Sequence, residues 1–175
     1  MSRIAEKINL FNAYLGSVNA ANKLIGVTDE VTLPEFENMS ETISLSGMAG
    51  EVDSPSPGQF KSVQIEIPFT NISSEALRAA ADDSKTIILR AAQEQVDTES
   101  LHKTSLGRII TIKGMTKSIN YGKLKKGGYG NPSLKKEVVY YKEEYNGEVI
   151  TEIDKFNTKC IINGVNIMQE IESLI

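Results

Sequence analysis

The clearest hydrophobic pattern in the chain is a strict alternation between positions 60 and 69. Val63, Ile65 and Ile67 occupy every second position, with polar residues between them. Because successive side chains of a strand point to opposite faces, this pattern predicts a strand with one buried face and one solvated face.

Other β-rich runs are separated by turn-forming residues, which is typical of antiparallel strands. The clearest turn is Asn146-Gly147, because this dipeptide tolerates the positive φ angles of a two-residue hairpin. Pro34 lacks a backbone N–H, so the strand before it is expected to end near Leu33. One run contains helix formers as well, but its Thr86-Ile87-Ile88-Leu89 favours a strand. The expected strands are 8–14, 24–33, 85–96, 105–119, a hairpin over 138–154, and 159–162.

A helix is expected at residues 74–81, the strongest run of helix formers in the chain. Ser73 is a suitable N-cap, and Glu75 in the first turn is favoured by the helix dipole. The helix is short, so its stability depends on packing one face against a sheet. The residues expected to form that face are Ala76, Leu77 and Ala80.

The C-terminal segment is expected to end in a short helix. After a second turn, Asn163-Gly164, apolar residues recur at helical spacing. Many strands with one flanking helix and a short terminal one predict a mainly β (α+β) fold, either two packed antiparallel sheets or a β-barrel. At 175 residues, the chain is expected to form a single domain, 1–175. The apolar residues of the C-terminal helix are Ile167, Met168, Ile171 and Leu174 or Ile175.

Residues 35–59 interrupt the succession of strands. They include Ser46-Gly47, Ala49-Gly50 and the Ser- and Pro-rich run 53–58, which predict a long loop. The stretch is nevertheless too apolar for a disordered linker, so we expect it to order against another surface, such as a second chain. Its apolar residues are Met39, Ile43, Leu45, Met48 and Val52.

Residues suited to catalysis or metal binding are scarce. The single Cys160 lies in an apolar, strand-like run and is expected to be a buried structural thiol. The single His102 lies in a polar connecting segment, and one His with one Cys cannot build a zinc site. Glu143 and Glu144 alternate along a strand, so they point to opposite faces and form no acid–base pair. We therefore expect a protein that is not an enzyme and uses no cofactor.

Phosphate-binding and membrane-spanning roles have little support in the sequence. The run Lys123-Leu124-Lys125-Lys126-Gly127-Gly128 lacks the residue order of a phosphate loop, and no helix is expected to follow it. No apolar run approaches the roughly 20 residues that cross a bilayer. The N-terminus also lacks the apolar region of a secretory signal.

Charge is segregated along a chain whose net charge is −4. Residues 24–60 contain acidic residues and no Lys or Arg, whereas residues 116–136 contain lysines and no acid. Three interpretations are open: two solvated faces, complementary surfaces that meet when copies assemble, or a nucleic-acid contact through the lysine-rich loop 120–132. The nucleic-acid interpretation ranks third, because the net charge is negative and the loop has no Arg to read bases.

Several segments resemble the tail tube protein of contractile-tailed phages and of phage tail-like (R-type) bacteriocins. Their order and spacing cover nearly the whole chain, whereas the loop 120–132 has no counterpart in the pattern of that family. In chain order, the similar segments are Asn9-Leu10-Phe11, Val31-Thr32-Leu33-Pro34, Ser46 to Asp53, the helix at 74–81 and the hairpin Val138 to Asp154.

The resemblance implies a structural subunit that forms hexameric rings, which stack into a hollow tube inside a contractile sheath. In such tubes, strands of neighbouring subunits join into one barrel around the channel, a conduit for DNA ejection or membrane puncture. The implied partners are further copies of the chain and the tail sheath, tape-measure, baseplate and tail terminator proteins. The implied location is a virion tail or tail-like particle assembled in the host bacterial cytoplasm.

The resemblance also implies that the loop 35–59 contacts the adjacent ring. The residues expected in this contact are Glu37, Met39, Glu41, Ile43, Leu45, Met48, Val52 and Asp53. The candidates for a complementary contact, or for a contact with the sheath, are Lys123, Lys125 and Lys126.

Two other functions remain open. A type VI secretion tube protein has the same architecture and differs in what it delivers. The other is a nucleic-acid-binding module built on the loop 120–132, which would bind without reading specific bases. Electron microscopy separates them, because rings or tubes favour a tube protein and dispersed monomers weaken that interpretation.

Overall fold

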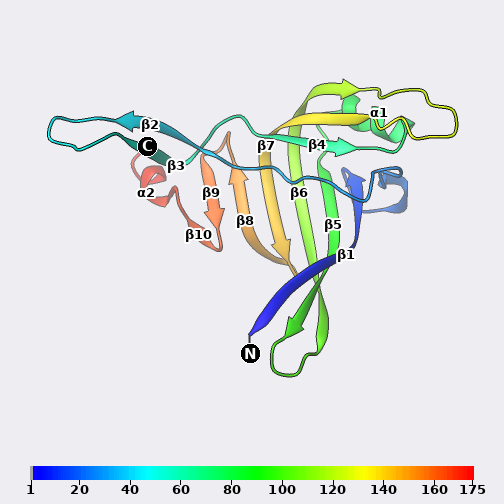
Figure 1. The fold of residues 1–175 in the computed structure, drawn as a ribbon, viewed down its shortest axis with the longest axis horizontal. Coiled ribbons are helices and arrows are strands. Elements are labelled where there is room, and N and C mark those ends of the chain that lie inside the picture. The colour runs from blue at the N-terminus through cyan, green and yellow to red at the C-terminus, as the bar shows by residue number, and fades with distance from the viewer. Residues whose placement is uncertain (1) are drawn as a thin grey trace.

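The computed structural model describes residues 2–175, and antiparallel strands dominate it (Figure 1). The predicted mainly β class, with two antiparallel sheets and few helices, is confirmed. The strands are β1 (Arg3–Leu15), β2 (Asn38–Ile43), β3 (Val52–Phe60), β4 (Gln64–Pro68), β5 (Ile87–Asp97), β6 (Lys103–Asn120), β7 (Ser133–Tyr145), β8 (Glu148–Asp154), β9 (Lys159–Ile162) and β10 (Val165–Asn166). The helices are the short 3-10 helix η1 (Ala20–Asn22), α1 (Ser74–Ala81) and α2 (Gln169–Glu172).

The larger sheet is open within one chain and branches at β7. Its strands follow the order β1-β5-β6-β7-β8-β9-β10, and β4 pairs with the first part of β7, from Ser133 to Glu137. Gly114 of β6 lies at a register shift opposite the branch. A Cβ atom at this position would come within 2.4 Å of the Glu137 carbonyl oxygen, so the bulge requires glycine.

The hydrophobic core lies on one face of this sheet, beneath β4 and the segment 24–36. Val63, Ile65 and Ile67 are buried, as their alternation predicts. Phe36 contacts Phe60 and Tyr141 edge-on, with ring centroids 5.3 Å apart in each pair. These aromatic contacts fasten the covering segment to the sheet. Other core residues are Leu15, Phe69, Ile87, Leu89, Ile110, Ile112, Leu134, Val138, Ile153, Cys160 and Met168.

Most of the predicted strands and turns are confirmed. The expected strands at 8–14, 85–96, 105–119 and 159–162 correspond to β1, β5, β6 and β9. Asn146 and Gly147 join β7 to β8 with φ angles of 47° and 85°, as an Asn-Gly hairpin turn requires. The Asn146 side-chain oxygen also accepts a hydrogen bond from the Gly107 backbone N–H at 2.8 Å, which ties this turn to β6.

The strand predicted at 24–33 is absent, and this prediction was wrong. Val27 makes only an isolated bridge with Phe69, and Lys23, directly before the segment, makes another with Tyr14. Its apolar residues Leu24, Val31 and Leu33 pack against the core without joining a ladder. Apolar, β-branched composition indicates burial on a sheet surface, and here the chain covers the sheet instead of extending it.

The long irregular loop predicted at 35–59 is instead a hairpin, formed by β2 and β3. Pro55 and Pro57 led to the wrong prediction, because proline is excluded from central strands. A two-stranded sheet has only edge strands, so a proline can occupy a position whose N–H faces away from its partner. Residues 35–37, before β2, and residues 44–51, at the tip, remain without strand structure.

Helix α1 has its predicted boundaries and its predicted cap. The Ser73 hydroxyl accepts a hydrogen bond from the Ala76 backbone N–H at 3.2 Å. Its buried face, however, is made of Ala76 and Ala79, whereas Leu77 is 39% exposed and Ala80 is half-buried. The expected packing face was therefore wrong about Leu77, because the two alanines let the helix backbone approach the sheet closely.

The short C-terminal helix is confirmed but covers less of the chain than the apolar spacing indicated. Val165 and Asn166 form strand β10, which pairs with β9 across the Asn163-Gly164 turn. Helix α2 begins only at Gln169. Met168, just before it, is buried in the core, whereas Leu174 is exposed.

Candidate interaction surfaces

The hairpin β2–β3 extends away from the rest of the molecule at one end of its long axis (Figure 1). All the residues expected in the inter-ring contact lie on this hairpin or directly before it. Glu37 precedes β2 and forms an ion pair with Lys61 at the base of the hairpin. Met39, Glu41 and Ile43 lie in β2; Leu45 and Met48 lie in the tip; Val52 and Asp53 lie in β3.

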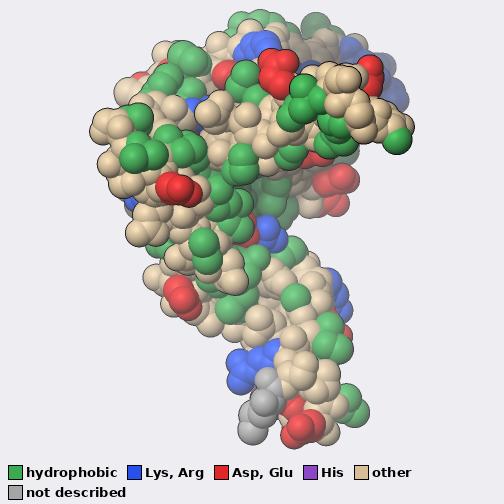
Figure 2. Space-filling model, turned by 90° about the vertical axis from the view of Figure 1, so that its left-hand side faces the viewer, with side chains coloured by type: hydrophobic (Ala, Val, Ile, Leu, Met, Phe, Trp, Pro, Cys, Tyr) green, Lys and Arg blue, Asp and Glu red, His purple; other side chains and the backbone are tan. Residues whose placement is uncertain are grey.

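One face of the hairpin combines exposed apolar side chains with the acidic Glu41. Ile43 pairs with Val52 and Glu41 pairs with Ser54, and paired residues share a face of an antiparallel ladder. Ile43 and Val52 are 39% and 53% exposed. Figure 2 views the molecule from the end that carries the hairpin and shows hydrophobic side chains open to solvent there. Exposed apolar clusters of this kind mark protein-interaction sites.

The lysine-rich loop joins β6 to β7 at the opposite end of the long axis (Figure 1). Lys123, Lys125 and Lys126 are all exposed, as are Tyr121 and Leu124. The prediction of a loop is confirmed for residues 121–132, although Asn120 still belongs to β6.

The neck of the lysine-rich loop is held in a fixed conformation. The Lys123 N–H donates to the Gly130 carbonyl oxygen at 3.0 Å, and the Gly130 N–H donates to Asn71 Oδ1 at 2.9 Å. Gly122 has a φ angle of 73°, and a Cβ atom there would come within 2.3 Å of the Gly130 carbonyl oxygen. The loop therefore leaves the sheet through a tight constriction that only glycine permits.

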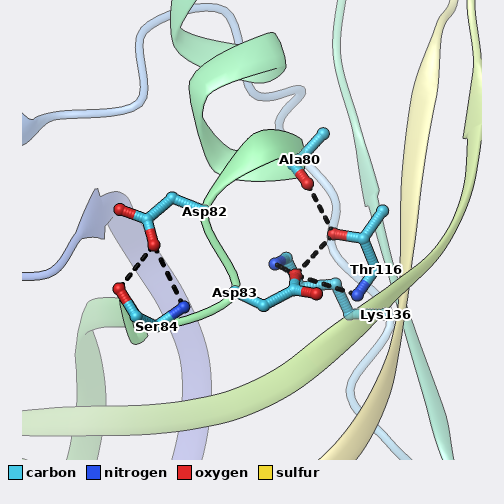
Figure 3. Close-up of polar contacts among 6 residues, drawn as sticks. All are labelled: Ala80, Asp82, Asp83, Ser84, Thr116 and Lys136. Atoms are coloured by element: carbon cyan, nitrogen blue, oxygen red, sulfur yellow. Dashed lines mark hydrogen bonds and ion pairs between the residues drawn. The ribbon is translucent and has the colours of Figure 1, made fainter.

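A buried lysine fastens the end of α1 to the sheet (Figure 3). The Lys136 side chain is 1% exposed, and its Nζ donates to Asp83 Oδ1 at 2.7 Å. The Thr116 backbone N–H donates to the same oxygen at 2.9 Å. The hydrogen bond from Lys136, followed by that from Thr116, lowers the pKa of the Asp83 carboxyl below its usual value. Sequence reasoning did not identify this cluster, although Lys136 lies two positions from the apolar Leu134 and Val138 and so shares their face of the strand.

A second buried polar cluster joins β6 and β7. The Arg108 Nε donates to Glu143, and the Tyr141 hydroxyl donates to the other oxygen of the same carboxylate at 3.0 Å. Burial raises the pKa of the Tyr141 phenol, so this group remains a neutral donor. Glu143 is buried while Glu144 pairs with Lys142, which confirms that the two carboxylates occupy opposite faces. The cluster is closed on itself and stabilises the sheet.

The expected placements of the single Cys and His are confirmed. Cys160 is 0% exposed, and burial raises the pKa of its thiol, which disfavours the reactive thiolate. His102 is exposed at the turn between β5 and β6. Within residues 2–175, no group of His, Cys, Asp and Glu side chains is arranged to hold a metal ion. In the same residues, no helix has the length and apolar character needed to cross a membrane.

Comparison with known proteins gives one family. The sequence model of the phage tail tube protein FII family matches residues 5–175, essentially the whole chain. No curated protein matches the chain. The open sheet and the projecting hairpin agree with a role in assembly. The chain therefore belongs to the phage tail tube protein FII family, whose members are structural subunits of phage tails.

Proposed function

We propose that this protein forms hexameric rings, which stack into the hollow inner tube of a contractile tail. The tube acts as a conduit for DNA ejection or membrane puncture. Membership of the tail tube family supports this proposal most directly. The proposed partners are further copies of the chain and the tail sheath, tape-measure, baseplate and tail terminator proteins. The proposed setting is assembly in the host cytoplasm into a virion tail or a bacteriocin particle.

The free edges of the large sheet support lateral association within a ring. Strand β1 has one sheet neighbour, β5, and residues 3–10 of β1 are exposed. The opposite edge ends in the two-residue strand β10. Exposed edges present unpaired backbone N–H and C=O groups, and closure of a barrel removes them. Copies of the chain that pair edge to edge around a ring satisfy these groups.

The hairpin β2–β3 is the proposed contact between stacked rings. An isolated two-stranded hairpin is marginally stable in water, and this one leaves an apolar face uncovered. A surface of the adjacent ring that covers Met39, Ile43 and Val52 stabilises the hairpin and joins the rings. The single observation that carries this part of the proposal is the solvent exposure of these residues on a projecting element.

Electron microscopy of the purified chain tests the proposal. We expect rings or tubes from the native protein, since no other component is needed for the self-contacts. A variant that lacks residues 39–53 is expected to keep its core, because these residues lie outside the core cluster. It should form rings but fail to form tubes. Native protein that stays monomeric at high concentration contradicts the tube proposal, and full-length tubes from the deletion variant contradict the role of the hairpin.

A further inference from the structure

Two surfaces of opposite charge project from opposite ends of the long axis (Figure 1). The first, here the acidic arm, is the hairpin over residues 38–60. The second, here the lysine loop, comprises residues 121–132. Each combines exposed charge with exposed apolar side chains, and their positions prevent them from meeting within one chain.

The carboxylates of the acidic arm form no ion pair among the described residues. Glu41, Glu51 and Asp53 form no ion pair within residues 2–175, and the hairpin contains no Lys or Arg. Asp53 accepts a hydrogen bond only from the neighbouring Thr42 hydroxyl, at 2.9 Å. Glu41 shares its face of the hairpin with the exposed Ile43 and Val52, whereas Asp53 lies on the opposite face.

The lysine loop mirrors this arrangement with the opposite charge. Lys123, Lys125 and Lys126 form no ion pair with any described residue. Leu124 is fully exposed between them, and Tyr129 is 66% exposed. The constriction at Gly122 and Gly130 holds the loop at its base, so less conformational freedom is lost when the loop is bound.

We propose that the acidic arm of one copy binds the lysine loop of the next copy in the assembly. This inference rests on the proposed tube function and specifies the surface that receives the arm. Glu41, on the same face as Ile43 and Val52, meets ammonium groups of the lysine loop, and the apolar residues of each surface cover those of the other. Because the two surfaces differ and lie at opposite ends, the contact is heterologous and repeats from copy to copy. The charges guide encounter and register, while the apolar contacts hold the joint.

A negatively charged nucleic acid is the competing occupant of the lysine loop. The loop contributes three clustered lysines and no arginine, on a chain with net charge −4. Phosphate neutralisation by so few lysines gives weak binding that disappears at moderate salt. The acidic arm, in contrast, offers an unpaired carboxylate beside exposed apolar side chains, which complements both the charge and the apolar residues of the loop, so a second copy is the better fit.

Charge reversal with compensation tests the pairing. Lys125→Glu with Lys126→Glu is expected to slow tube growth about tenfold, because like charges then face each other. Adding Glu41→Lys and Glu51→Lys should restore most of the rate. As a matched control, Glu99→Lys on the β5–β6 turn and Glu148→Lys at the exposed start of β8 restore the same net charge elsewhere and should not restore growth. Raising ionic strength until the Debye length falls below about 8 Å should slow the native protein.

A cross-linking experiment locates the contact directly. One variant carries Glu41→Cys and another carries Lys125→Cys, and the buried Cys160 stays out of reach of oxidant. A mixture under oxidising conditions is expected to give disulfide-linked dimers during tube growth. In the control mixture, Leu101→Cys takes the place of Lys125→Cys. Leu101 is 75% exposed on the β5–β6 turn, and this mixture should give no disulfide-linked dimers.

The outcomes separate this inference from the tube proposal. If the native protein forms no tubes, the proposed function fails. If tubes of the loop-reversed protein grow at the native rate and the cysteines do not cross-link, the tube proposal stands and the pairing is wrong. If loop reversal abolishes binding of a fluorescent DNA duplex to the protein but leaves tube growth unchanged, the lysine loop is a nucleic-acid contact, and the pairing is again wrong.

Discussion

At the scale of single residues, Lys136 shows how the sheet accommodates a buried charge. Its register on β7 places it between the core residues Leu134 and Val138. An ammonium group in this position is costly unless it meets an opposite charge. Asp83 supplies that charge from the segment after α1, and its side chain is 45% exposed. The ion pair therefore bridges the core and the solvent and positions the end of the helix.

Substitution of Asp83 measures the contribution of this pair. Asp83→Asn is expected to reduce the free energy of unfolding by about 1–3 kcal/mol, because the buried ammonium loses its counter-charge. Partial exposure of the carboxylate places the effect toward the lower end of this range. Asp82→Asn is the matched control, since its contacts with Ser84 and Lys85 lie at the surface. Urea denaturation measures both variants, and equal losses would show that the Lys136 contact is no stronger than a surface interaction.

At the scale of secondary-structure elements, α1 is attached through its smallest side chains. Ala76 and Ala79 are buried, and Thr116 of β6 lies against the end of the helix, with its hydroxyl 2.8 Å from the Ala80 carbonyl oxygen. Leu77, the largest apolar residue of the helix, is directed away from this contact and is 39% exposed. The helix is therefore positioned by close backbone approach and by polar contacts at its C-terminal end.

A pair of truncations separates the helix surface from the core. Leu77→Ala is expected to cost about 1 kcal/mol or less, because much of the side chain already contacts water. Ile67→Ala removes a fully buried side chain from β4 and should cost about 2–5 kcal/mol. Denaturant midpoints of the isolated subunit give both values. A loss of several kcal/mol for Leu77→Ala would mean that this residue is covered in solution, for instance by a second copy.

At the scale of the whole molecule, ion pairs of carboxylates make the free energy of unfolding depend on pH in the acidic range. Lys136 lowers the pKa of Asp83 below 3.8, and a hydrogen bond from Lys159 lowers that of Glu152 below 4.5. A carboxyl whose folded pKa is depressed stabilises the fold above its unfolded pKa, and this contribution is lost as the pH falls through the folded value. Both groups therefore predict a loss of stability that begins as the pH falls toward 4.5 and 3.8 and continues below them.

Denaturation at several pH values tests this dependence. We expect the urea midpoint to be nearly constant from about pH 7 to about pH 5 and to fall steadily below about pH 4. Glu152→Gln should weaken the dependence, since this position then no longer titrates. A midpoint that is unchanged down to about pH 3 would show that these ion pairs contribute nothing to stability in solution.

The sequence alone determined the features that depend on neighbouring residues. Alternation at Val63, Ile65 and Ile67, the positive φ angles of Asn146-Gly147 and the Ser73 cap follow from local backbone geometry, and all three are confirmed. The resemblance spread over the chain indicated the tail tube family, which the family match confirms.

Tertiary structure decided the features that depend on distant segments. The apolar run 24–33 covers the sheet instead of joining it, because burial can be satisfied without a ladder. Residues 35–59 pair with each other as an edge hairpin, where proline is tolerated. The partner of Lys136 comes from a residue 53 positions earlier in the chain, so no local pattern could reveal it. Likewise, segregated charge was visible in the sequence, but only the fold places the acidic arm and the lysine loop at opposite ends, where one copy can reach the next.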